Sequence, residues 1–220
     1  MLTDTVTINI EDSLTLSKLT GYYKIARVDG GSFETGFLWY GNKTGLWKTL
    51  SSDSINETIT LLSLASYDNG KLNGRLIDFY DDSYPYDDFY YKNNVKVGFQ
   101  REFGDSGKPV LIYETNEEQN FINDYYAISL NGDTLYHTNF GKEATGLVKR
   151  YNRWGALERE GNMVKGKMDT VIDYWFDIPA GEYTSATFSI YTDSSSQCFR
   201  VDSNLHVKDI ESYRRAKLLR

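Results

Sequence analysis

The chain is poor in the residues that many catalytic and metal sites need. Among 220 residues there is one cysteine, Cys198, which excludes an internal disulfide and a cysteine-based zinc site. Only two histidines are present, His137 and His206, and the chain has no Gly-x-Ser-x-Gly, Walker-type or dinucleotide-type glycine motif. We therefore expect no metal site, no cofactor and no enzymatic activity.

Long apolar runs and an excess of basic residues are also missing. No run of about 18 apolar residues exists, so we expect no transmembrane helix. Residues 1–10 lack the features of a signal peptide, which predicts a cytoplasmic protein if Met1 is native and a cell-envelope protein if a leader was removed. The net charge of −7 argues against nucleic acid as a partner and favours a basic protein.

What the chain does have is aromatic residues and a recurring phrase. Aromatics make up 15% of the residues, as is typical of β proteins. The phrase runs from an aromatic to a glycine, and its clearest copy is Tyr-Asp-Asn-Gly-Lys-Leu-Asn-Gly at 67–74. Its closing positions are separated by steps of 24, 26, 22 and 20 residues: Gly74, Gly98, Asp124, Gly146 and Gly166. A period in this range indicates a repeat array.

Each repeat predicts one β-hairpin. Runs such as 75–80, 98–103 and 147–151 alternate polar and apolar residues, then turn residues follow, and a second strand returns at 110–113 or 134–138. An earlier copy is expected at 36–47. Five residues after the closing positions the chain has Phe79, Phe103, Ser129, Tyr151 and Val171. The pattern predicts that these five side chains stack into a shared core stripe.

With these glycines and aromatics the chain resembles the MORN-repeat proteins, in particular a divergent bacterial MORN-like variant. The resemblance covers about half of the chain. It departs from the pattern at Asn93-Asn94, where Asn-Gly is typical, and at Asp124, where glycine is typical. The resemblance implies an elongated array of antiparallel hairpins and contact with other proteins, because some members are antitoxins or immunity factors.

The chain is predicted to have three parts. Residues 1–58 form N-terminal strands with a degenerate repeat, residues 59–176 form the hairpin array, and residues 177–220 form a C-terminal β cap with a short helix from 209 onward. A cap is expected because an array must cover its last strand edge.

An acidic and aromatic segment at 81–88 is the strongest candidate for a binding site. It interrupts the first repeat with four carboxylates and two tyrosines. We interpret it as a solvated turn insertion, and the alternatives are a loop that contacts a protein and, after that, a metal or catalytic site. Tandem tyrosines in a strand point to opposite faces, so one member of each pair is exposed to a partner. The candidate binding residues are Asp81, Asp82, Tyr84, Tyr86, Asp87, Asp88, Tyr90 and Tyr126.

Three functions stay open on the sequence. The first is a non-enzymatic protein-binding repeat protein of antitoxin, immunity or scaffold type. The second is a cell-envelope or surface module that binds protein or glycan, since tyrosines also stack on sugars. The third is a hydrolase, which would need carboxylates such as Asp87 and Asp88 to face each other across a cleft.

Overall fold

The computed structural model of the chain describes residues 17–26, 31–53, 58–80, 84–152, 155–177, 182–191 and 196–201. Every regular element in these ranges is a β-strand, so the predicted all-β array of antiparallel hairpins is confirmed. The strands fall into two compact units, residues 1–107 and 108–220. The short helix expected from residue 209 lies outside the described residues.

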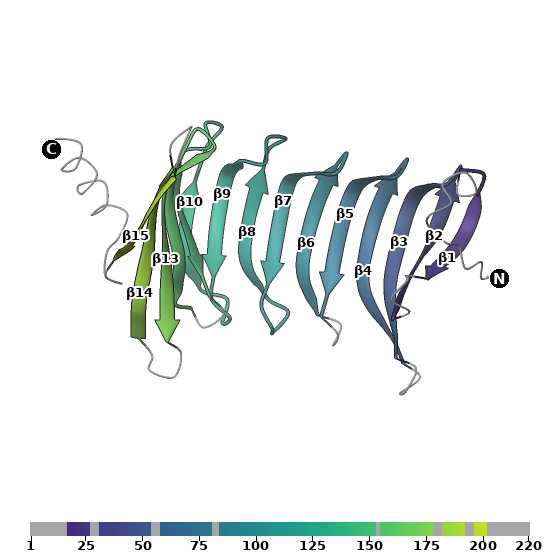
Figure 1. The fold of residues 1–220 in the computed structure, drawn as a ribbon, viewed down its shortest axis with the longest axis horizontal. Coiled ribbons are helices and arrows are strands. Elements are labelled where there is room, and N and C mark those ends of the chain that lie inside the picture. Colours follow the sequence, from purple (N-terminus) through teal and green to yellow (C-terminus); the bar gives the residue numbers. More distant parts are fainter. Residues whose placement is uncertain are drawn as a thin grey trace. The chain divides into compact units, whose positions relative to one another are not determined.

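The described part of unit 1, residues 1–107, has seven strands in one layer (Figure 1). Each strand pairs antiparallel with the next along the chain. Their bounds are β1 Gly21–Ala26, β2 Ser32–Trp39, β3 Asn42–Asp53, β4 Thr58–Asp68, β5 Lys71–Phe79, β6 Pro85–Lys92 and β7 Val95–Phe103. The repeat expected at 36–47 is confirmed as the β2–β3 hairpin.

Three hairpins of unit 1, β2–β3, β4–β5 and β6–β7, close with two-residue turns in which both central residues have positive φ. These φ values are 44° and 79° at Tyr40-Gly41, 46° and 79° at Asn69-Gly70, and 51° and 71° at Asn93-Asn94. Such turns match the twist of the flanking strands and favour Asn and Gly. Asn tolerates this conformation, so the departure from Asn-Gly at Asn93-Asn94 leaves the turn unchanged.

The turns also hydrogen-bond to the preceding hairpin. The second turn residue donates its N–H to a carbonyl there, from Gly70 to Lys43 at 2.9 Å and from Asn94 to Leu72 at 2.9 Å. The Asn94 side chain in turn accepts the Leu72 N–H at 2.7 Å. This contact fixes each hairpin against its neighbour and gives a physical reason for the repeat period.

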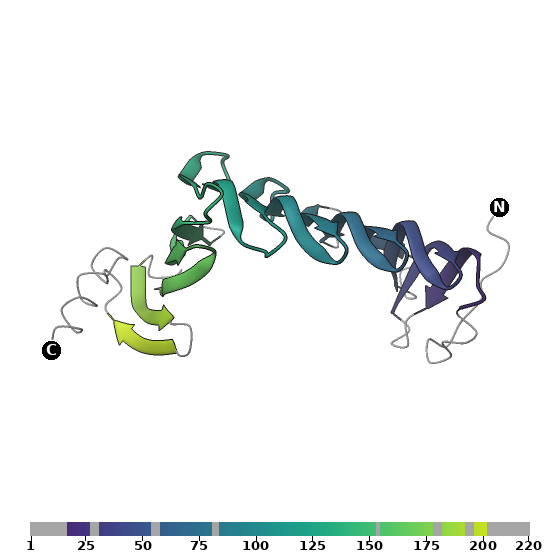
Figure 2. The ribbon, with the colours of Figure 1, turned by 90° about the horizontal axis from the view of Figure 1, so that it is seen from above.

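One face of the unit 1 sheet carries its buried apolar side chains, and we call it the inner face. Residues directly opposite in paired strands share a face. A row of such partners crosses β3 to β7: Trp47, Ala65, Leu76, Phe89 and Gln100. Trp47 and Gln100 are only 2% and 0% exposed. A single layer can bury them because its strands curve along their length (Figure 2).

The described part of unit 2, residues 108–220, has two groups of paired strands around one core. One group is β8 Pro109–Thr115, β9 Phe121–Ile128 and β10 Thr134–Asn139, and the other is a five-stranded sheet of β11 Gly146–Tyr151, β12 Leu157–Val164, β13 Lys167–Asp177, β14 Glu182–Tyr191 and β15 Ser196–Val201. In the core, Tyr125 of β9 and Phe140, which follows β10, pack with Val148 of β11 and Met163 of β12. The β strands predicted after residue 177 are present as β14 and β15.

Two sequence predictions are wrong in detail. The predicted core stripe is not a buried row, because among its five members only Val171 is buried. Bulges in the ladders, such as the register shift between Asp78 and Phe79, change which residues share a face. The turn insertion expected over 81–88 is wrong from Pro85 onward, where strand β6 begins and pairs with β5.

Candidate functional site

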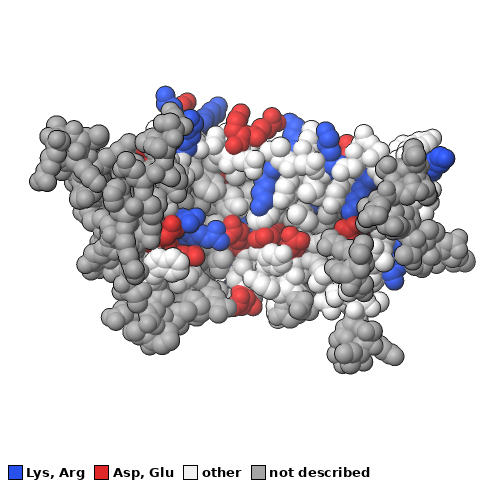
Figure 3. All heavy atoms as spheres, viewed as in Figure 1, with Lys and Arg blue, Asp and Glu red and all other residues white. Residues whose placement is uncertain are grey.

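A second row of cross-strand partners on the inner face is polar and acidic. It runs from β2 to β7 through Glu34, Thr49, Ser63, Asp78, Asp87 and Glu102. We call this set the acidic row. The face shown in Figure 3 has a band of acidic atoms across its middle, with a few basic side chains beside it. The acidic row lies on the same face as the buried row through Trp47 and Gln100.

Like charges stand directly opposite one another in this row. Asp78 pairs with Asp87 and Asp87 pairs with Glu102 in the register of β5, β6 and β7. Burial raises the pKa of Asp78, and the positive charge of Lys96 opposes that shift. Adjacent carboxylates on one face repel each other, so this arrangement lowers the stability of the sheet.

Two lysines reach from the inner face toward the acidic row. Lys96 lies over the Phe89 ring, with Nζ 3.2 Å from the ring centroid, and its charge is felt by all three carboxylates at this end of the row. Burial lowers the pKa of Lys96 despite these carboxylates. Lys43 pairs with Glu34 at 2.7 Å. The lysines offset only part of the charge, because the row contains four acids.

Tyrosines border the acidic row on β6 and after β5. The rings of Tyr80 and Tyr86 are 5.0 Å apart. Burial raises the pKa of Tyr86 and of Tyr91, and the charges of Asp78 and Asp87 raise both further. Both phenols therefore stay protonated and can donate hydrogen bonds at neutral pH.

The structure divides the predicted site residues among different places. Asp81 and Asp82 lie outside the described residues. Tyr84, Tyr86 and Asp87 lie on or beside β6, and Asp87 belongs to the acidic row. Tyr126 lies in unit 2, where its ring stacks on His137 at 4.4 Å.

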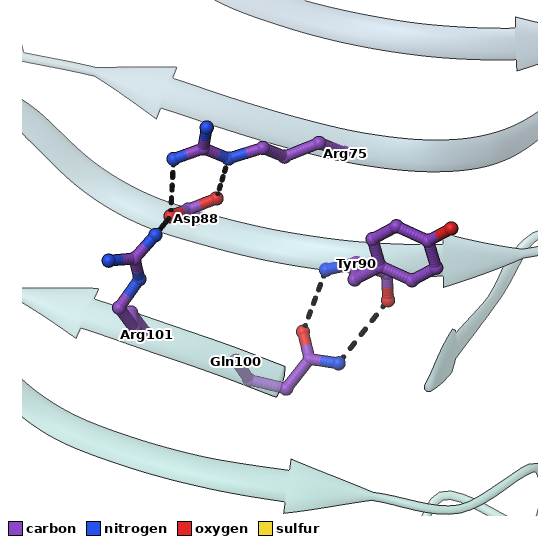
Figure 4. A network of polar contacts seen from close by, with 5 residues as sticks. All are labelled: Arg75, Asp88, Tyr90, Gln100 and Arg101. Atoms are coloured by element: carbon purple, nitrogen blue, oxygen red, sulfur yellow. Dashed lines mark hydrogen bonds and ion pairs between the residues drawn. The ribbon is translucent and has the colours of Figure 1, made fainter. Parts of the chain in front are cut away.

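Asp88 and Tyr90 lie on the opposite face of the unit 1 sheet, which we call the outer face. Asp88 is 5% exposed and is held by Arg75 through two contacts of 2.5 and 2.8 Å and by Arg101 (Figure 4). Its carboxylate is thus occupied by two arginines. Tyr90 is half exposed, which confirms that the members of the Tyr90-Tyr91 pair face opposite ways.

Sequence reasoning missed Asp78, Glu102 and Lys96. They lie on the strands either side of β6. Only the register places Asp78 and Glu102 opposite Asp87, and Lys96 lies opposite Tyr91, where its charge acts on these carboxylates. The signal in the sequence is that these charged residues lie next to apolar residues along their strands. To align them with Asp87 from the sequence, the positions of the ladder bulges would have to be known in advance.

Within the described ranges, no group of three or more His, Cys, Asp or Glu side chains is arranged to hold a metal ion. No helix in that part of the chain is long and apolar enough to cross a membrane. No protein-family model matches the chain, and no curated protein matches it significantly.

The ion pairs of Asp88 predict a pH-dependent contribution to stability. Burial alone would raise the pKa of Asp88, but the hydrogen bonds and charges of Arg75 and Arg101 outweigh it and lower the pKa below 3.8. A lowered folded pKa stabilises the fold above the unfolded pKa and stops doing so as pH falls through the folded value. We expect Asp88→Asn to lose about 1 to 2 kcal/mol at pH 7.

Urea denaturation at pH 7 and at pH 3 measures this difference. The gap between wild type and Asp88→Asn should shrink at the lower pH, whereas Asp68→Asn, at an exposed position, should match wild type throughout. An unchanged gap at both pH values would show that the charge of Asp88 is not what stabilises the strands.

Proposed function

We propose that the chain is a non-enzymatic, protein-binding repeat protein whose acidic row receives a basic segment of a partner. The observation that supports this most is the alignment of Asp78, Asp87 and Glu102 across three strands. Each like-charge pair lowers stability by roughly 0.2 to 1 kcal/mol. Destabilising pairs of this kind are typical of functional surfaces, where residues needed for binding lower the stability of the fold.

The surroundings of the row suit a protein ligand. Tyr80, Tyr84 and Tyr86 are exposed beside it, and tyrosine is enriched at protein interfaces. Lysine or arginine side chains of the partner would relieve the repulsion among the carboxylates. Complementary charge of this kind raises the association rate and makes binding depend on salt.

The resemblance to bacterial MORN-like proteins, together with the acidic balance of the chain, leads us to propose an antitoxin, immunity or scaffold role. In this proposal the partner is a basic protein, and an immunity role would require it to be a toxin. The hairpin array agrees with the fold that the resemblance implies. The biological role depends on which partner protein is identified.

A comparative pull-down tests the proposed surface. The full chain and the variant Asp78→Asn/Asp87→Asn/Glu102→Gln serve as baits in lysate and secreted fraction of the source organism, with mass spectrometry as readout. We expect a basic protein that wild type retains near-stoichiometrically and that the triple variant loses. A charge-matched control, Asp68→Asn/Asp133→Asn/Glu143→Gln, changes three exposed acids outside the row and should retain it.

Equal recovery by the triple variant would exclude the acidic row as the binding surface. If both triple variants lost the partner equally, the loss would reflect the net charge of the chain and not the position of the three acids.

The same surface predicts a stabilising substitution. Asp78→Asn removes one charge from a like-charge pair, so it should raise the free energy of unfolding by about 0.2 to 1 kcal/mol at pH 7. Burial raises the pKa of Asp78 above 3.8, so the cost of keeping this carboxylate ionised in the folded state exists above the raised pKa and disappears as pH falls through it. Thermal melting at pH 7 and pH 3 checks this, and a variant less stable than wild type at pH 7 would contradict it.

A further inference from the structure

The outer face of β1 and β2, with the turn after β2, carries a connected group of aromatic rings, three of which are exposed. Tyr22 and Phe37 meet edge to face at 5.2 Å, Phe37 and Trp39 are near-parallel at 6.5 Å, and Trp39 meets Tyr40 at 5.1 Å. Tyr22, Trp39 and Tyr40 are 71%, 52% and 62% exposed. We call these four residues the aromatic platform. Large exposed apolar patches on a soluble protein mark binding surfaces.

Tyr40 occupies its place at a conformational cost. It has φ 44° at the first position of its turn, where the equivalent turns of unit 1 have Asn69 and Asn93. A positive φ is uncommon for bulky residues, because the side chain crowds the backbone. The ring still projects into solvent beside Trp39, so core packing does not explain the choice of residue. Strain of this kind is found at ligand-binding positions.

A row of cations and a hydroxyl lies beside the platform. Lys24 is opposite Thr35, and Thr35 is opposite Lys48, in the register of β1, β2 and β3. Lys24 and Tyr22 are two residues apart in β1 and therefore share the outer face. The acidic row lies on the other face of the sheet. This part of the outer face thus attracts anions locally although the chain is acidic overall.

The spacing of the two lysines restricts the ligand. They lie on strands separated by two strand spacings, which is about 10 Å. That distance corresponds to one disaccharide step of an extended polysaccharide. The C–H faces of pyranose rings carry partial positive charge and stack on the negative faces of aromatic rings. Lys24 and Lys48 would then meet carboxylates on alternate sugars.

We propose that the aromatic platform, with Lys24 and Lys48, binds an acidic polysaccharide in which carboxylated sugars alternate with neutral ones. The chain would lie across β1, β2 and β3, with its sugar rings on the aromatics and its carboxylates on the lysines. Thr35 supplies a hydroxyl between the two lysines for hydrogen bonding. This site is on the opposite face from the acidic row and is independent of the proposed protein binding.

Nucleic acid and anionic membrane fit the same surface less well. Each nucleotide brings a phosphate, and two lysines give few phosphate contacts against the net charge of −7. Membrane attachment through charge needs several clustered basic residues, because each one contributes only a small part of the attraction. An alternating polysaccharide needs only the two cations that are present.

Titration of hyaluronan octasaccharide into the full chain tests the proposal, with tryptophan fluorescence and calorimetry as readouts. We expect saturable binding that weakens as salt rises. Trp39→Ala should raise Kd at least tenfold, and Lys24→Gln/Lys48→Gln should raise it about tenfold and flatten the salt dependence. The control Lys71→Gln/Lys142→Gln removes two exposed lysines elsewhere and should bind as wild type does.

Several results would overturn the proposal. One is no binding of the octasaccharide. Others are equal affinity for a neutral chitin octasaccharide, or tighter binding of single-stranded DNA or of vesicles containing phosphatidylserine. If Trp39→Ala fails to fold, as judged by circular dichroism, Tyr22→Ala takes its place. The triple variant of the acidic row should bind the octasaccharide normally, which separates this test from that of the proposed protein partner.

Discussion

Gln100→Leu is expected to lower the free energy of unfolding of unit 1 by about 3 kcal/mol. The ladder between β6 and β7 breaks between Phe89 and Tyr91, and the Gln100 side chain fills the break. Its Oε1 accepts the Tyr90 N–H at 3.1 Å, and its Nε2 contacts the Tyr90 carbonyl oxygen at 3.2 Å (Figure 4). The same Nε2 contacts the carbonyl oxygens of Val97 and Gly98 at 3.1 and 3.2 Å. Leucine fills similar space but cannot hydrogen-bond.

The cost arises because these groups are buried. Gln100 is fully buried, so water cannot replace the lost bonds, and each unsatisfied buried polar group costs about 1 to 3 kcal/mol. Urea denaturation gives the stability, and hydrogen exchange of peptides from β6 and β7 locates the loss. Lys71→Leu places leucine at an exposed position of β5 and should change stability by less than about 0.5 kcal/mol. A similarly small loss for Gln100→Leu would contradict the prediction.

Trp47→Ala should cost about 3 to 5 kcal/mol, the usual range for truncating a buried aromatic. Trp47 forms a core with Ile25 and Leu38, and its indole N–H donates to the Phe37 carbonyl at 3.1 Å. The indole also lies directly on Gly36, where an added Cβ would come within 2.4 Å of the ring. Removal of the ring thus leaves a cavity and an unpaired carbonyl.

A double-mutant cycle with Gly36→Ala makes this test specific. Gly36→Ala alone should destabilise unit 1, because the new methyl group collides with the indole. In the Trp47→Ala background the same change should cost much less, since the obstacle is gone. Trp39→Ala, on the exposed platform, is the matched control and should leave denaturant midpoints nearly unchanged. Additive effects of the first two substitutions would show that the ring does not lie on Gly36.

The repeat period was the most reliable signal in the sequence. It predicted a recurring hairpin, and Gly74 and Gly98 lie in β5 and β7, the second strands of two hairpins whose turns are at 69–70 and 93–94. The period can be seen in the sequence because turn conformations depend on local residues. Gly74 has a φ of 112°, which glycine adopts easily, and the turn pairs need residues that tolerate positive φ. The second strands predicted at 110–113 and 134–138 are confirmed as β8 and β10.

The site could be predicted only in part. The sequence drew attention to the acids around β6, and Asp87 is one member of the acidic row. Asp87 and Asp88 are adjacent in sequence but point to opposite faces, so one faces the row and the other is held by Arg75 and Arg101. Composition cannot distinguish two such neighbours, because their roles depend on the face each occupies.

The sequence by itself determined the class of the fold, the hairpin period, the turns and the overall acidic balance, because these follow from local conformational preference and from counting. The tertiary structure decided which residues stand side by side. A ladder bulge shifts a strand by a residue and moves its later side chains to the other face. The acidic row, the buried row through Trp47 and Gln100, and the aromatic platform all depend on that register, which long-range strand pairing sets.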